Sequence, residues 1–399
     1  GFVKTALVLY HQVLPALPHY QTQPESVGAE PFYHVPRAPV FWPVDHREQP
    51  RRACLDALTA DGGAMAVVLE EPPAARHAHA NRHLGAPLGP PAHGLFLLQG
   101  GDTHALAAQL AHLAAHLQEA RGAGQSIGRA ALEWFRRHRE TSGSRTMAVS
   151  LCDYPEFDAI LDKARHALES GSALTLNGLA GCHFTPRPLG SGHPPVLVYP
   201  GSGNHYLGMG GQLSAQWPAV WRAANQATER FAAQCRLARL IPFRADWREG
   251  WRQEALAAID ADPVTAICGQ VVFGCLATDL LRRLGIAPAA VIGYSLGETV
   301  GYFATGAWPD RGHMLERLES SDLFRNELAG PCRAVRRALP IPDEAPVAWR
   351  TAVVNRSAAW IRKRLADFPA LRLLIVNTPD ECVIGGHGPA LEAFIHRMD

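Results

Sequence analysis

Apolar and polar residues alternate along the chain with two periods, which predict strands and helices. Short apolar runs, of the kind that form buried strands, occur at residues 95–98, 147–151, 196–199 and 289–292. Segments with apolar residues three or four positions apart, typical of amphipathic helices, occur at residues 103–118, 155–168 and 274–284. Strands and helices that follow one another in this order predict an α/β fold.

A second pattern occupies the last part of the chain. Residues 347–354, 359–365, 371–376, 381–384 and 390–397 read as strand, helix, strand, strand and helix. This order is the split βαββα pattern of a ferredoxin-like subdomain that lacks its last strand.

Residues 1–90 have a different character. They begin with a helical pattern at residues 3–9, continue through a long proline-rich stretch and reach an apolar strand at residues 65–69. The His77–His83 tract could be read as metal-binding, but no acidic or cysteine ligand accompanies it, which favours a polar surface linker. These residues are too few for a core of their own, and we expect them to close a preceding domain. A glycine- and proline-rich stretch at residues 186–195 then separates a small α/β unit from the rest.

Composition narrows the class of protein. The chain has 399 residues, 47% of them hydrophobic, which predicts more than one domain with sizeable cores. A net charge of +1 gives no electrostatic case for nucleic acid as a partner. We expect no membrane partner, because no apolar run approaches the length that crosses a bilayer. Eight scattered cysteines without a C-x-x-C pair favour free thiols in the cytoplasm and no metal site.

The most informative motif is Gly-Tyr-Ser-Leu-Gly at residues 293–297. It follows an apolar strand and precedes a helical pattern, which is the setting of a nucleophile elbow that exposes the hydroxyl of Ser295. Side chains at Gly293 or Gly297 would collide with so tight a turn. The following helix would direct free N–H groups and the positive end of its dipole at an oxyanion formed there.

A second glycine-bracketed turn, at residues 200–205, follows the strand at 196–199. Such a loop can offer backbone N–H groups to an anion. It lacks the lysine and the glycine spacing of a phosphate loop. An oxyanion-hole loop that works with Ser295 and an ordinary turn between strand and helix both remain open from the residues alone.

Together these motifs resemble the acyltransferase domain of type I polyketide and fatty-acid synthases. VYPGSGNHYLGMG at residues 198–210 is similar to the opening glycine-rich segment of that family, and GYSLGE at 293–298 to its elbow. IVNTP at 375–379, followed by CVIGG at 382–386, resembles the asparagine-bearing loop and strand of its small subdomain.

The resemblance extends towards the start of the chain. Residues 2–15 and 51–72 resemble the end of a ketosynthase, although residues 55–64 replace its usual glycine-rich run, as in a degenerate ketosynthase or a chain-length factor. The resemblance is greatest to synthases of polyunsaturated fatty acids or heterocyst glycolipids.

The resemblance implies a domain order and a fold class. Residues 1–90 would be the remnant of a thiolase-like ketosynthase, and residues 91–190 the ketosynthase–acyltransferase linker, a small α/β domain. Residues 191–399 would be an acyltransferase domain cut at its C-terminus, with the α/β hydrolase-like core of malonyl-CoA:carrier-protein transacylases and a ferredoxin-like subdomain from about residue 330.

The chemistry that the resemblance implies is acyl transfer through an acyl-serine. Ser295 would take the acyl group from acyl-CoA and pass it to the phosphopantetheine thiol of an acyl carrier protein, with no bound cofactor. The N–H groups of Ser202 and Leu296 would form the oxyanion hole. Other domains of the synthase would be partners. The sequence leaves the oligomeric state open, and a dimer through the ketosynthase-like region is compatible with the resemblance.

The roles of the remaining site residues follow from the resemblance to the acyltransferase family and from the positions at which this chain differs from it. In the family that the chain resembles, the histidine base lies roughly one helix and one strand past the Gly385-Gly386 turn, so the resemblance implies that Asn377 would orient a base beyond Asp399. His387 and His396 suit a surface loop and helix, and His205 suits the substrate side. Without that base, this stretch of chain would be inactive by itself.

Two departures concern the substrate. The position of the arginine that holds a malonyl carboxylate falls on Ser320, and Arg317, one helical turn earlier, could replace it or be a solvated surface residue. Malonyl, acetyl and longer acyl groups therefore stay open. Tyr294 replaces the usual histidine beside the nucleophile and makes its surroundings more apolar.

Two other function classes fit the same elbow. A serine esterase or thioesterase would release the acyl group to water. A module without catalysis would act only as a scaffold within the synthase.

Overall fold

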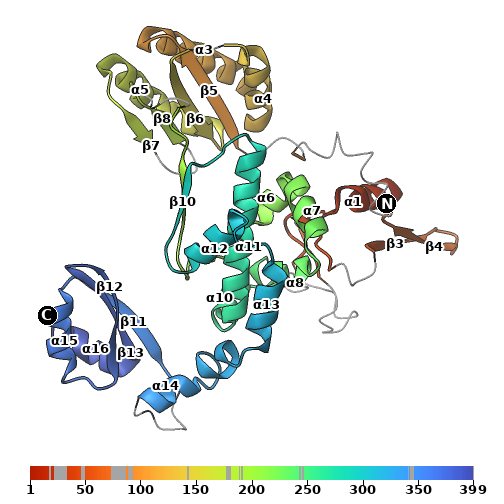
Figure 1. Ribbon diagram of the computed structural model, residues 1–399. Helices are drawn as coiled ribbons and strands as arrows, with labels where there is room; N and C mark the ends of the chain where they lie inside the picture. Colours follow the sequence, from red (N-terminus) through yellow and green to blue (C-terminus); the bar gives the residue numbers. More distant parts are fainter. Residues whose placement is uncertain are drawn as a thin grey trace. The chain divides into compact units, whose positions relative to one another are not determined.

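The computed structural model (Figure 1) describes residues 1–17, 19–21, 34–45, 50–72, 87–88, 93–141, 143–176, 181–187, 189, 192–241, 244, 247–339, 341 and 346–398. The His77–His83 tract lies outside these residues. The chain divides into two compact units, which are described separately: Gly1–Arg248 with Gln270–Pro309, and Glu249–Gly269 with Asp310–Asp399. The domain boundaries expected at residues 90 and 190 stay a prediction.

The first unit begins with a helix followed by short strands. They are α1 (Phe2–His11), β1 (Val13–Leu14), β2 (Val40–Phe41), β3 (Arg52–Leu58) and β4 (Ala64–Glu70). The helix at the start and the apolar strand β4 were predicted. Strand β3 was not, and it pairs antiparallel with β4 from Arg52 opposite Glu70 to Leu58 opposite Ala64.

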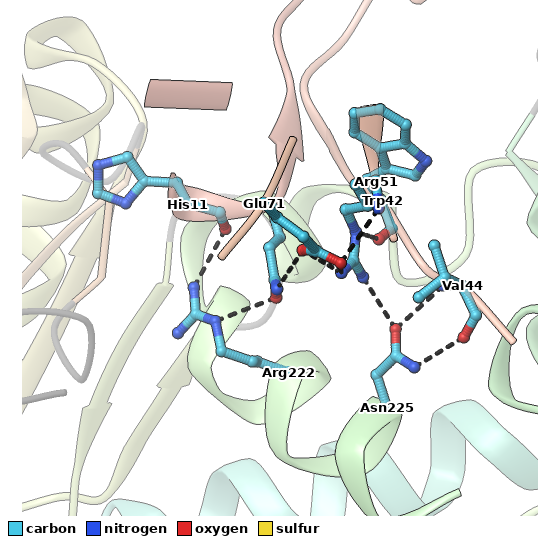
Figure 2. A network of polar contacts seen from close by, with 8 residues as sticks. His11, Trp42, Val44, Arg51, Glu71, Arg222 and Asn225 are labelled. Carbon is cyan, nitrogen blue, oxygen red and sulfur yellow. Dashed lines mark hydrogen bonds and ion pairs between the residues drawn. The ribbon is translucent and has the colours of Figure 1, made fainter. Parts of the chain in front are cut away.

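A buried ion pair fixes the ends of this hairpin to a helix far along the chain (Figure 2). The guanidinium of Arg51 lies 2.9 Å from the carboxylate of Glu71, and its Nε donates to the carbonyl oxygen of Trp42 at 2.7 Å. Its Nη2 donates to Oδ1 of Asn225, on α7 (Pro218–Ala227), at 3.0 Å. Burial lowers the pKa of Arg51, while Glu71 acts in the opposite sense. The amide of Asn225 also exchanges two hydrogen bonds with the backbone of Val44.

A second buried arginine of α7 extends the network. Nε of Arg222 donates to Oε1 of Gln12 at 3.1 Å, and its Nη2 donates to the carbonyl oxygen of His11 (Figure 2). The amide of Gln12 in turn donates to Glu71 at 3.1 Å. Burial and the charge of Arg51 lower the pKa of Arg222. Segments near residues 12, 44, 51 and 71 are thereby held against one helix.

The middle of the first unit is a sheet with its own core. Strands β5 (Gly94–Gly100), β6 (Arg145–Leu151), β7 (Leu174–Leu176) and β8 (Gly181–Phe184) form an antiparallel sheet in the order β5-β6-β8-β7. Helices α3 (Thr103–Gly122), α4 (Ile127–His138) and α5 (Tyr154–Ser170) supply the other core side chains. The strands and helices predicted between residues 95 and 168 are confirmed, and α4, β7 and β8 are additional to them.

The last part of the first unit holds a parallel pair of strands, β9 (Val196–Tyr199) and β10 (Ala290–Gly293), at the positions predicted. Between them come α6 (Gly211–Gln216), α7, α8 (Phe231–Cys235), α9 (Leu237–Leu240), α10 (Trp251–Asp260) and α11 (Pro263–Arg283), and α12 (Leu296–Ala304) follows β10. Of these, α10 and the first turns of α11 belong to the second unit.

Helix α11 corrects one expectation. It is longer than the segment that the periodicity predicted, and by length and composition alone it could cross a membrane. Of its apolar window, 67% is buried inside the protein, as in a core helix. The statement that no apolar run reaches such a length is therefore wrong, and the absence of a membrane partner stays a prediction.

The second unit continues with α13 (Arg311–Ser320), a π-helical turn at Leu323–Glu327 and α14 (Arg333–Ala338). Then β11 (Trp349–Val354), α15 (Ala358–Leu365), β12 (Leu371–Thr378), β13 (Glu381–His387) and α16 (Gly388–His396) follow in the predicted order. The sheet order is β11-β13-β12 with antiparallel neighbours, and α15 and α16 pack against it around a core that includes Ile361, Ile384 and Phe394. This confirms the incomplete ferredoxin-like pattern, and both units together confirm the α/β class.

Two neighbouring ion pairs of the hairpin, one buried and one half exposed, can be compared in a stability measurement. Replacing Glu71 with Ala leaves the Arg51 charge buried, so we expect the free energy of unfolding to fall by about 3–5 kcal/mol. In the neighbouring pair Arg52–Glu70 both side chains are about half exposed. Glu70→Ala should therefore lower the free energy of unfolding by less than about 1 kcal/mol. Urea unfolding followed by circular dichroism compares the two, and equal losses would contradict the role given to the network.

Candidate active site

Ser295 lies in a sharp turn between a strand and a helix. Only Tyr294 and Ser295 separate the end of β10 from the start of α12. The backbone of Ser295 has φ 53° and ψ −115°, a conformation that non-glycine residues rarely adopt and that costs about 1–3 kcal/mol. Gly297 N–H donates to the carbonyl oxygen of Tyr294, and Glu298 N–H to that of Ser295, both at 2.9 Å. This is the geometry of a nucleophile elbow.

The glycines of the motif are required by close backbone contacts. A Cβ atom on Gly293 would overlap the backbone of Gly297 and Glu298, and one on Gly297 would overlap the carbonyl group of Tyr199. The collision predicted from the sequence is therefore confirmed at both positions. A third contact was not predicted: a Cβ on Gly201 would meet the ring of Tyr294.

The glycine-bracketed loop lies beside the elbow because of strand register. β9 and β10 run parallel with Tyr199 opposite Gly293, so both strands end at the same edge. Tyr294 N–H donates to the carbonyl oxygen of Tyr199 at 3.1 Å and joins the two turns. The structure thus brings the start of the loop, at Pro200 and Gly201, to the edge that carries Tyr294, Ser295 and Leu296. Ser202 and His205 follow later in the same loop.

Two amide groups at this edge are available to a ligand. Leu296 is the first residue of α12, where N–H groups have no partner within the helix. In the described part of the chain, neither the Leu296 N–H nor the Ser202 N–H donates to another group. Free N–H groups and the positive end of the α12 dipole are features that attract an anion.

The side chains around the elbow are open to solvent. Ser295 is exposed, and the ring of Tyr294 is 56% exposed. His205 is half-buried. No residue that the structure describes hydrogen-bonds the Ser295 hydroxyl, so these contacts assign no general base. His396 lies exposed in the last turn of α16, as expected. His387 does not lie in a surface loop: it is the half-buried last residue of β13, where it pairs with Trp349.

The two remaining candidates belong to the second unit. Arg317, on α13, is exposed and borders a cavity of about 430 Å³ lined also by Leu318, Ser320, Ser321 and Phe324. It makes no ion pair with any of the described carboxylates.

Asn377 lies near the end of β12, where its amide donates to Oε1 of Glu381 at 2.9 Å. Glu381 was not identified from the sequence, although it begins the strand that pairs with β12.

Sequence reasoning also missed Gln270. This residue of α11 is 7% exposed, and its amide donates to the carbonyl oxygens of Pro200 and Gly201. A lone polar residue within an apolar stretch of helix is the signal that could have found it. Among the described residues, no cluster of three or more His, Cys, Asp or Glu side chains is placed to hold a metal ion.

The strain at Ser295 generates a stability prediction. Glycine adopts positive φ without the clash of a Cβ atom, whereas alanine keeps the clash. We expect Ser295→Gly to be more stable than Ser295→Ala by about 1 kcal/mol, after allowing for the greater freedom of glycine in the unfolded chain. Paired urea titrations measure the difference, and a more stable alanine variant would show that the turn is not strained.

Comparison with known proteins gives relatives along the whole chain. No family model matches it. It is 25% identical over 400 residues to a phenolphthiocerol/phthiocerol polyketide synthase polypeptide of Mycobacterium tuberculosis, covering 100% of this chain and 16% of that protein. It is 26% identical over 412 residues to polyketide synthase GfsE of Streptomyces halstedii, covering 100% of this chain and 10% of that protein. The chain thus spans a small part of the relatives it matches.

Solved structures with some likeness are acyltransferase domains. The domain from module 8 of the salinomycin polyketide synthase is 20% identical, with a TM-score of 0.45 and coverage of 77% of this chain and 63% of that one. The acyltransferase domain of ZmaA is 16% identical, with a TM-score of 0.48 and coverage of 78% and 63%. The narrower resemblance to polyunsaturated fatty acid or heterocyst glycolipid synthases stays a prediction. The sequence relatives of this chain are polyketide synthases, as its motifs predicted.

Proposed function

We propose that this chain is the acyltransferase region of a polyketide synthase. The observation that carries the proposal is the strained elbow at Ser295, set beside a loop with an uncommitted N–H group. The Ser295 oxygen attacks the thioester carbonyl of acyl-CoA, the C–S bond breaks, and CoA leaves as its thiol. The phosphopantetheine thiol of an acyl carrier protein then attacks the acyl-serine ester and regenerates the hydroxyl.

The N–H groups of Ser202 and Leu296 would stabilise the oxyanion of both tetrahedral intermediates. The parallel register of β9 and β10 supports this assignment, because both strands end at the same edge and each amide lies within three residues of one strand end. One such donor typically lowers the barrier by about 3–4 kcal/mol. The Ser295 hydroxyl also needs a base. A histidine in that role, oriented by the Asn377 amide, belongs to the proposal, and His205 and Tyr294 would face the acyl group.

Arg317 is proposed to select the acyl group. Its guanidinium is exposed on a cavity that Ser320 and Ser321 also line, and in the described residues it has no carboxylate partner. An acyl group with a free carboxylate, such as malonyl, would supply that partner through two parallel hydrogen bonds. An acetyl or longer apolar acyl group is the alternative.

The proposal places the protein in the cytoplasm, with acyl-CoA, an acyl carrier protein and other domains of a synthase as its partners. An esterase or thioesterase has the same elbow, so the elbow alone does not separate transfer from hydrolysis. The fate of the acyl group does separate them.

Acyl-CoA treatment of the synthase polypeptide that carries this chain tests the proposal. We expect a mass increase on the peptide that contains Ser295, because the acyl-serine forms before the acceptor reacts. The Ser295→Ala variant controls for acylation elsewhere. No adduct with malonyl-, acetyl- or long-chain acyl-CoA would contradict the proposal, and rapid release of free acid without adduct would favour the hydrolase.

The selectivity assigned to Arg317 has its own test. Arg317→Ala should reduce acylation of Ser295 by malonyl-CoA about 10- to 100-fold, because a charge-assisted pair is lost, and leave acetyl-CoA nearly unchanged. Arg325→Ala, at an exposed arginine that does not line the cavity, is the matched control. An equal loss of acylation with malonyl-CoA and acetyl-CoA, or no loss with either, would contradict selection by Arg317.

A further inference from the structure

We infer that Gln270 is a positioning residue that fixes the peptide group between Gly201 and Ser202 and so aims the Ser202 N–H at the oxyanion. The catalytic part of this inference rests on the proposed function. Its structural part rests on contacts within the first unit alone.

Gln270 holds the loop by both hydrogens of its amide. Nε2 donates to the carbonyl oxygen of Pro200 at 2.8 Å and to that of Gly201 at 2.6 Å. Gln270 is 7% exposed and lies on a long helix, so these bonds come from a rigid element and are shielded from water. Two adjacent peptide groups of the loop are thereby fixed from one side.

A planar peptide transmits this restraint to Ser202. The carbonyl of Gly201 and the N–H of Ser202 belong to one trans peptide group, so they point in opposite directions. Asn204 Nδ2 donates to the same Gly201 oxygen at 2.9 Å. With that oxygen held by two amides, the Ser202 N–H is directed away from Gln270 and makes no hydrogen bond with any residue that the structure describes.

The loop needs such a restraint because its own sequence restricts the backbone little. Gly203 has φ 91°, and glycine on both sides of Ser202 leaves the backbone flexible. Gly201 also packs so closely against the Tyr294 ring that a Cβ atom would not fit. Small rotations of the 201–202 peptide would therefore misdirect the donor without any change of sequence in the elbow.

Stability alone does not explain a glutamine here. Its Oε1 atom is buried and has no hydrogen-bond partner in the described part of the chain. An unsatisfied buried acceptor is destabilising, and methionine would fill the same volume without it. The Gln270 amide thus has one unsatisfied acceptor, Oε1, and two N–H donors that both bond the loop. This arrangement fits a role in orienting the loop.

The test compares Gln270→Met with wild type in the synthase polypeptide. We expect the rate of Ser295 acylation at saturating acyl-CoA to fall at least tenfold and KM to change less than twofold. The urea midpoint should change little, because the loss of two hydrogen bonds is offset by removal of the buried unsatisfied acceptor. Asn204→Ala, which removes the second donor to Gly201, should give a smaller loss in the same direction. Thr278→Val is the matched control, because Thr278 lies on the same helix and bonds the Tyr199 hydroxyl but not the loop.

Hydrogen–deuterium exchange of residues 200–206 separates this inference from the proposed function. Exchange should accelerate at least tenfold in Gln270→Met and not in Thr278→Val, whether or not acylation is observed. If wild type forms no acyl-serine but the exchange changes as expected, the proposed function fails and the positioning role survives. Unchanged exchange, or full acylation activity in Gln270→Met, would overturn the inference.

Discussion

Two tight backbone turns have to meet at one edge of a parallel strand pair, and the rest of the candidate site depends on this contact. Tyr199 and Gly293 end their strands side by side, and the Tyr199 carbonyl both accepts the Tyr294 N–H and packs against Gly297. No Cβ atom fits at Gly293 or Gly297. Glycine at these positions therefore lets the strained Ser295 and the loop that carries Ser202 share one edge.

Hydrogen bonds from neighbouring helices of the first unit stabilise this contact and its surroundings. Gln270 of α11 donates to the carbonyl oxygens of Pro200 and Gly201 and so restrains the loop that carries Ser202. Further along the first unit, the network of Arg51, Glu71 and Arg222 fastens the segments near residues 12, 44, 51 and 71 to α7. Removal of Glu71 would leave the Arg51 charge buried without its partner, so the network favours this one arrangement of distant segments.

Local patterns determined what the sequence could predict. The elbow, the loop after β9 and the order of the ferredoxin-like elements follow from glycine spacing and from periodicity within a few residues, and the structure has them where they were expected. The buried network was not predictable, because Gln12 and Arg222 meet across 210 positions with no local signal. The contact of Gln270 with Gly201, 69 positions away, was hidden for the same reason. The pairing of Asn377 with Glu381 and the positive φ of Ser295 are local, but they depend on side-chain and backbone angles that periodicity does not report. The length of α11 was underestimated because its first turns lack the amphipathic pattern that marks its end.

The central claim is that Ser295 carries an acyl group between two thiols. The most direct measurement is a chase: form the acyl-serine with acyl-CoA, remove the donor, add phosphopantetheinylated acyl carrier protein, and follow the mass of both proteins. The account predicts that the adduct leaves the Ser295 peptide and appears on the carrier thiol in equal amount. An adduct that is lost to water as free acid, or that never forms on Ser295, would contradict it.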